Sequence, residues 1–287
     1  MLLPSTASPS REFCPVSYVL SVLLGLFLKL WRWGILVKNY QVRSSIARLF
    51  SAYFLGQSVN ILLPFRSGEL VRVGYFAGNP NVLPEIISTI VLEKYLDLIA
   101  LTVCGILVSL KISLDNILNL RGWLLPLTII LTLLFLIVVL FGPVIWRKIS
   151  SRKLLPNRLA VWLDRWVQAS QWLRNPRQIL PMILLTSLIW VVMWLTNLLL
   201  SRGVGITLGG TAAGLVLFAV YIGLLPALMP GNIGPFYFFA SLALIPFGIM
   251  HEQALLFAII LHAIVTLPPL LGGLIGVSLH PTHVINP

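Results

Sequence analysis

Two groups of charged residues interrupt an otherwise very apolar sequence. The first group lies beside a proline and a glycine, and the second lies inside the apolar run 86–110: Arg66, Glu69 and Arg72, then Glu93, Lys94 and Asp97. A charge in hydrocarbon is costly unless it is paired or faces water. At about 100° per residue, Glu93 and Asp97 share one face of a helix. The six charges therefore predict one polar cavity inside a membrane.

The residue types in this cavity suggest the binding of a phosphate group. Arg66 and Arg72 each offer a planar fork of donors that keeps its charge when water is removed. If the chain resumes a helix after Gly68 or Gly231, free backbone N–H groups would also attract an anion. The three carboxylates could hold the arginines in place or contact a cationic headgroup. In the alternative interpretation, all six charges form a structural ion network.

The composition places the chain among membrane proteins. Hydrophobic residues make up 58% and charged residues 10% of the chain, whereas soluble proteins are about 25% charged. We expect one all-α polytopic membrane domain over 1–287, with 1–15 as a tail that lacks the features of a signal peptide. Cys14, Cys104 and His262 have no metal or redox spacing and are expected to pack, so no metal and no cofactor are expected.

The basic residues report the orientation of the chain. Residues 29–48 contain five basic residues and no acidic one, and 147–177 contain eight basic residues against one acidic residue. These two segments account for the whole net charge of +12. Because they flank apolar spans, they indicate two cytoplasmic loops and not a nucleic-acid surface.

The order of apolar runs predicts a re-entrant hairpin. A crossing needs about 20 apolar residues, and eight runs are candidates: 16–36, 47–63, 86–110, 122–146, 178–201, 210–229, 232–249 and 253–279. If all of them crossed, three crossings would put the two basic loops on opposite sides. The conflict disappears if the second run breaks at 64–68 and returns to the side from which it entered. We therefore expect about five to eight membrane segments.

A matching break interrupts the second half of the chain. Residues 203–250 carry no formal charge, and Gly231, Asn232 and Gly234 lie in a break at 230–235. A second hairpin here would open from the other side, which would make the halves an inverted repeat with two broken helices near the membrane midplane. Two ordinary crossings joined by a tight loop are the alternative.

The connector between the halves, 147–177, is expected to lie on the cytoplasmic leaflet. Its apolar residues fall on one face at helical spacing: Leu159, Trp162, Leu163, Trp166 and Leu173. Such a basic amphipathic helix favours anionic lipid. Packing of the same helix against other protein is the alternative.

Three motifs together resemble the lysylphosphatidylglycerol synthase transmembrane region, a flippase-like membrane family. They are Asn60–Arg72, Glu93–Asp97 and the Pro-Gly-rich element at 230–234. The resemblance runs from about residue 18 to residue 279. It implies a multi-pass protein of a bacterial or archaeal plasma membrane whose partner is an anionic phospholipid or a lipid-linked phosphate. It also implies that the residues of these motifs bind the substrate.

The chain departs from the family pattern in several places. Family members usually have one more helix before the helix that starts near Val16. Asn232 stands where glycine is common, and the acidic residue expected soon after Gly234 is absent, which puts an acid-dependent step there in doubt. No soluble aminoacyl-transferring domain follows the last apolar run, so lipid aminoacylation is not expected.

We therefore expect a flippase-like protein that moves a phosphate-bearing lipid between leaflets, and not an enzyme. A membrane-embedded enzyme that uses Glu93 and Asp97 as metal ligands or as an acid–base pair is one alternative. An accessory subunit of a cell-envelope lipid pathway is the other.

Overall fold

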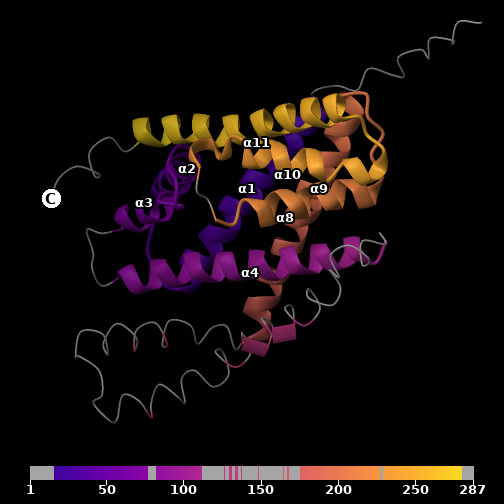
Figure 1. The fold of residues 1–287 in the computed structure, drawn as a ribbon. Helices are drawn as coiled ribbons and strands as arrows, with labels where there is room; N and C mark the ends of the chain where they lie inside the picture. Colours follow the sequence, from indigo (N-terminus) through magenta and orange to yellow (C-terminus); the bar gives the residue numbers. More distant parts are fainter. Residues whose placement is uncertain are drawn as a thin grey trace, which may run out of the picture.

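The computed structural model describes residues 16–76, 82–111, 175–226 and 229–279, together with single positions between 126 and 167. The elements of these ranges are helical (Figure 1): α1 (Val16–Asn39), α2 (Ile46–Leu62), α3 (Gly68–Gly74), α4 (Leu83–Ser109), α8 (Pro176–Gly203), α9 (Gly210–Gly223), η3 (Pro230–Asn232), α10 (Pro235–Leu242), η4 (Ile245–Phe247) and α11 (His251–Leu279). The apolar run 122–146 and the amphipathic helix expected at 156–174 lie largely outside the described residues. The expected all-α class is confirmed.

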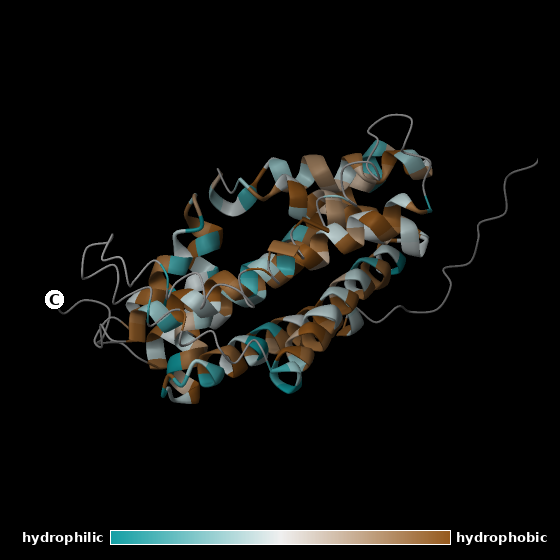
Figure 2. Cartoon of the chain, turned by 90° about the horizontal axis from the view of Figure 1, so that it is seen from below, coloured by the Kyte–Doolittle hydropathy of each residue, from teal (hydrophilic) through white to brown (hydrophobic). Residues whose placement is uncertain are grey.

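The long helices carry the apolar surface of a polytopic membrane protein. Three of them, α1, α8 and α11, are long and apolar enough to cross a bilayer. Their outward faces are lined by large aliphatic side chains; on α11, Leu267, Leu271 and Leu274 are each more than half exposed. Hydrophobic residues cover much of the helical surface in Figure 2. Water would penalise such a surface, whereas lipid tails match it.

Helices α1 and α8 pack against each other in opposite directions. Tyr18 near the start of α1 lies beside Gly203 at the end of α8. Farther along, Ser21 shares a hydrogen bond of 2.9 Å with Thr196, and Arg32 donates to Thr186 at 3.0 Å. The last turn of α1 and the first turn of α8 therefore lie at the same end of the molecule, which we call the basic end because Lys38 and Arg177 are there.

The first hairpin, residues 46–74, begins and ends at the basic end. The buried hydrophobic side chains form two clusters. The C-terminal half of α1 and the N-terminal half of α4 contribute to one of them, whereas Leu28, earlier on α1, and Leu101, later on α4, belong to the other. These two helices are therefore antiparallel, and α4 begins where α1 ends. Between them, α3 folds back against α2, where Gly68 lies directly on Gly56.

The second hairpin, residues 210–242, begins and ends at the opposite end. Helix α11 runs antiparallel to α2, because Ser58 donates to the carbonyl of Pro269 at 3.0 Å while Ser51 lies against Gly276. Helix α11 therefore starts at the end where α8 finishes. Helices α9 and α10 pack against each other between these two points.

The hairpin of each half packs against a long helix of the other half. The first hairpin places α2 on α11, the last described helix of the other half, and the second hairpin places α9 on α4. Helices α1 and α8, which open the two halves, contact each other. Helix order, direction and contacts thus have the pattern expected of an inverted repeat.

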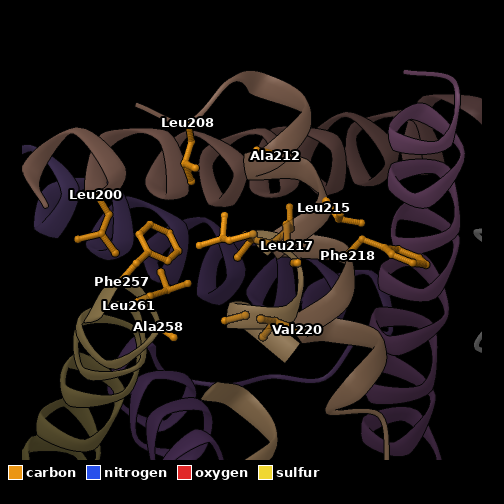
Figure 3. Close-up of a cluster of buried hydrophobic side chains, with 14 of the residues drawn as sticks. Leu200, Leu208, Ala212, Leu215, Leu217, Phe218, Val220, Phe257, Ala258 and Leu261 are labelled. Carbon is orange, nitrogen blue, oxygen red and sulfur yellow. The ribbon is translucent and has the colours of Figure 1, made fainter. Parts of the chain in front are cut away.

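Small residues allow α9 to enter the core. Figure 3 shows Leu200, Phe257 and Leu261 converging with the buried side chains of α9. Gly214 lies on α4, where an added Cβ would meet Val108 at 2.9 Å. This close packing fixes the second hairpin against the long helices.

Candidate binding cavity

The tip of the first hairpin is a sharp turn that its sequence specifies. Phe65 and Arg66 adopt left-handed backbone angles, with φ of 62° and 52°. Asn60 accepts a hydrogen bond of 2.8 Å from the backbone N–H of Gly68, where α3 begins. A Cβ on Gly68 would overlap the carbonyl oxygen of Gly56. The glycine is therefore required by close approach, and the turn directs Arg66 away from α3.

The tip of the second hairpin has a similar backbone. Gly231, Asn232 and Gly234 have φ of 66°, 53° and 92°. Asparagine tolerates this region better than most residues, so Asn232 fits where the family commonly has glycine. Next to the tip, the Nδ1 atom of His262 shares a hydrogen bond of 3.0 Å with the hydroxyl of Tyr237. His262 is thus a polar bridge between α10 and α11.

Arg72 is the centre of a buried ion network. Its side chain is completely buried, and it donates to Glu93 at 2.6 Å and to Glu69 at 3.1 Å. Its guanidinium also lies over the ring of Trp33, 4.2 Å from the centroid. The two charged groups expected to share one site, on α3 and α4, therefore meet.

Arg32 completes the network and corrects the sequence analysis. We assigned Arg32 to a cytoplasmic loop, but it lies inside α1, is completely buried, and grips Asp97 through two hydrogen bonds of 2.8 and 3.0 Å. It also lies 3.8 Å from Glu93. Lys94 pairs with Glu69 at 2.8 Å. The network therefore contains three basic and three acidic side chains and is neutral in itself.

A cavity of about 320 Å³ lies beside this network, between the two hairpin tips. Its basic lining residues are Lys29 from the middle of α1, Arg66 from the first tip and Lys94 from α4. Among the residues that the structure describes, no aspartate or glutamate lines it. The second tip contributes Gly231 and Asn232.

The expected site residues thus divide into two groups. Arg66, Lys94, Gly231 and Asn232 line the cavity, whereas Glu69, Arg72, Glu93 and Asp97 belong to the network and Gly234 lies outside the lining. Lys94 belongs to both groups, because it also pairs with Glu69. Lys29 was not among the residues predicted for the site. A signal was present, because Lys29 and Arg32 are three residues apart inside an apolar helical run and so share a face.

Lys29 and Arg66 are the unneutralised charges of the cavity. Neither forms an ion pair with any residue in the described ranges. Lys29 donates to the hydroxyl of Tyr221 at 3.3 Å, a neutral partner. Tyr53 also lines the cavity, and its buried hydroxyl has no hydrogen-bond partner within the described part of the chain. The cavity therefore offers two positive charges that make no ion pair with a described residue.

The remaining lining gives the cavity an apolar side. This side is formed by aliphatic and aromatic residues at α9, α10 and α11: Val216, Leu217, Val220, Leu224, Phe236, Leu261 and Val265. Uncharged polar side chains also line the cavity: Ser21, Gln57, Asn60, Thr196, Asn197 and Thr266. A molecule bound here would meet positive charge on one side and hydrocarbon on the other. This is the chemistry of an anionic amphipath.

Comparison with known families supports the same class of protein. The sequence profile of the lysylphosphatidylglycerol synthase transmembrane region matches residues 10–273, which include both hairpins and the cavity. The chain belongs to this family. Membership relates it to the modification or flipping of membrane lipids. Comparisons with curated proteins and with solved structures found no significant match.

The described residues also bear on the metal-dependent alternative. Within the described ranges, no group of three or more histidine, cysteine, aspartate or glutamate side chains is placed to hold a metal ion. Glu93 and Asp97 are each engaged by arginine guanidinium groups. These two carboxylates are therefore ion-pair partners of arginines in this structure.

Proposed function

We propose that the protein binds the headgroup of a phosphate-bearing lipid in this cavity and moves it between the two leaflets while the lipid tails remain in the bilayer. The observation that carries this proposal is the lining of the cavity. Three basic side chains and no acidic side chain of the described residues face it, between two hairpin tips and beside an apolar wall.

The position of the cavity suits such a passage. Lys29, Lys94 and His262 lie near the middle of α1, α4 and α11. Helix α2 has 17 residues and is about 25 Å long, which is shorter than a hydrocarbon layer of about 30 Å. A helix of this length that enters at one face of the bilayer ends inside the layer. We infer that both hairpins are re-entrant, the first from the cytoplasmic side and the second from the other side. Polar side chains in the middle of the membrane would replace the hydrogen bonds to water that a headgroup loses when it enters the bilayer.

The ion network and the cavity have separate roles in this proposal. The neutral network joins α3 to α1 and α4 and so holds the first hairpin in place. Arg66 and Lys29 are left to meet the ligand, because neither makes an ion pair with a residue that the structure describes. The two interpretations of the sequence, structural clamp and binding site, therefore apply to different residues.

The enzyme alternative receives less support. A metal ligand or acid–base pair needs carboxylates that are free to bind a metal or exchange a proton. Glu93 and Asp97 are instead held by Arg72 and Arg32 at 2.6 and 2.8 Å. We therefore propose a binding and transfer function without a chemical step on the lipid.

The test is transfer of a fluorescent anionic phospholipid in liposomes that contain the purified protein. We expect transfer above the rate of protein-free liposomes. Arg66→Gln removes one charge-assisted contact and should slow transfer roughly tenfold or more. Arg66→Lys keeps the charge without the bidentate fork, so its transfer rate should lie between those of the wild type and Arg66→Gln. Lys38→Gln, a change at an exposed position on α1, is the matched control and should behave as the wild type.

Two results would contradict the proposal. One is transfer no faster than in protein-free liposomes when the protein is folded and correctly inserted. The other is a change in the mass of the lipid during incubation, which would indicate an enzyme.

A further inference from the structure

We propose that the cavity selects lipids whose headgroup ends in a phosphomonoester, and that Lys29 and Arg66 hold this phosphate from two elements, α1 and the tip of the first hairpin. This inference rests on the proposed function and adds the class of headgroup and a second binding residue. The lipids of this class share a terminal phosphate group with up to two negative charges.

The charge count of the described residues carries the argument. Lys94 is neutralised by Glu69 at 2.8 Å, and the arginines of the network are neutralised by its other carboxylates. Lys29 and Arg66 remain, so the cavity has two positive charges that make no ion pair with a described residue. A phosphomonoester carries about −1.5 to −2 charges at neutral pH. It therefore matches both cations, whereas a phosphodiester, with one charge, leaves one cation unpaired in a poorly solvated place.

The hydrogen-bond donors match the same group. The hydroxyl of Tyr221 donates to the sulfur of Met193 at 2.9 Å, which turns its lone pairs towards Lys29. Lys29 keeps two further donors, because an ammonium group has three. The guanidinium of Arg66 adds five donors. Lys29 and Arg66 thus supply enough donors for the three terminal oxygens of a phosphomonoester; a diester has two such oxygens.

The size of the cavity agrees with a compact headgroup. Its volume of about 320 Å³ lies at the lower end of the range for small-molecule sites. A phosphate followed directly by the lipid body fits a cavity of this size, and the acyl chains can then lie along the apolar wall.

The experiment compares two lipids with identical acyl chains, phosphatidic acid and phosphatidylglycerol, in the liposome transfer assay with the full chain. We expect phosphatidic acid to be transferred roughly tenfold faster or more, the effect of one charge-assisted contact. Lys29→Gln should bring phosphatidic acid down to the rate of phosphatidylglycerol and leave the latter little changed. Lys29→Arg keeps the charge and should retain the preference, and Lys38→Gln should not alter it.

Binding measurements separate this inference from the proposed function. Native mass spectrometry of the protein in micelles should show phosphatidic acid bound in preference to phosphatidylglycerol, and inorganic phosphate should compete weakly because it lacks the acyl chains. Equal binding and equal transfer of the two lipids would overturn the inference and leave the proposed function standing. Preferential binding without any transfer would support the site and contradict the proposed function. Equal stabilisation by inorganic phosphate and by phosphatidic acid would overturn a lipid as the ligand.

Discussion

The buried pair of Arg72 and Glu93 gives the sharpest prediction about stability. Arg72 is completely buried, donates to Glu93 at 2.6 Å and lies 4.2 Å from the ring centroid of Trp33. In Arg72→Gln, the ion pair left to Glu93 within the described structure is the one with Arg32 at 3.8 Å. Breaking a buried ion pair costs about 3–5 kcal/mol, because the remaining charge loses its compensation. We therefore expect the free energy of unfolding to fall by about this amount.

A double-mutant cycle tests the contact itself. Glu93→Gln alone should also be severe, but the double variant leaves no lone charge at the contact. It should cost less than the sum of the single variants by about 1–3 kcal/mol. The matched control is Arg66→Gln combined with Glu93→Gln. These residues make no ion pair with each other in the described structure, so their effects should add within about 0.5 kcal/mol.

The assay is unfolding in mixed micelles by titration with sodium dodecyl sulfate, followed by tryptophan fluorescence. Additive effects of Arg72→Gln and Glu93→Gln would refute the network. A coupling of the same size between Arg66 and Glu93 would refute the separation of the cavity from the network.

Three further predictions concern the hairpins. Gly68→Ala should destabilise the protein by about 1–3 kcal/mol or more, since its Cβ would overlap the backbone of α2; Gly74→Ala, which has open space around it, should be tolerated when thermal unfolding is compared. Asn60→Ala leaves the N–H of Gly68 unpaired and should cost about 1–3 kcal/mol in the same measurement. With both native cysteines replaced, single cysteines at Lys38 and Arg177 should react with a membrane-impermeant thiol reagent from the same side; labelling from opposite sides would contradict the antiparallel packing of α1 and α8.

Much of the fold was predictable, because prolines and glycines show where the apolar helical runs are interrupted. A proline and a glycine interrupt the first hairpin, and two prolines and two glycines interrupt the second. A proline has no backbone N–H to donate, and the two glycines of the second break adopt positive φ angles that a helix does not use. The charges on α3 and α4 predicted a buried site, because a charged side chain in an apolar setting needs a partner. Charged residues are rare inside membrane segments for the same reason. Arg72 and Glu93 are such partners.

The partners within the site were less predictable. Lys29 and Arg32 were assigned to a loop, because counting basic residues near the end of a span does not show where a helix stops. Only the packing of α1 on α4 reveals that Arg32 binds Asp97. The different roles of Arg66 and Arg72 depend on the turn at the hairpin tip, which sends one side chain into the cavity and the other into the network. Spacing along the chain does not contain that information.

The central claim is that a lipid phosphate binds between Lys29 and Arg66. The most direct test is an experimental structure of the protein in nanodiscs that contain phosphatidic acid. We predict density for a phosphate in the cavity, with oxygens about 2.7–3.2 Å from the Nζ atom of Lys29 and from the guanidinium of Arg66. Lipid density confined to the outer faces of α1, α8 and α11, with these two side chains turned away from each other, would contradict the account.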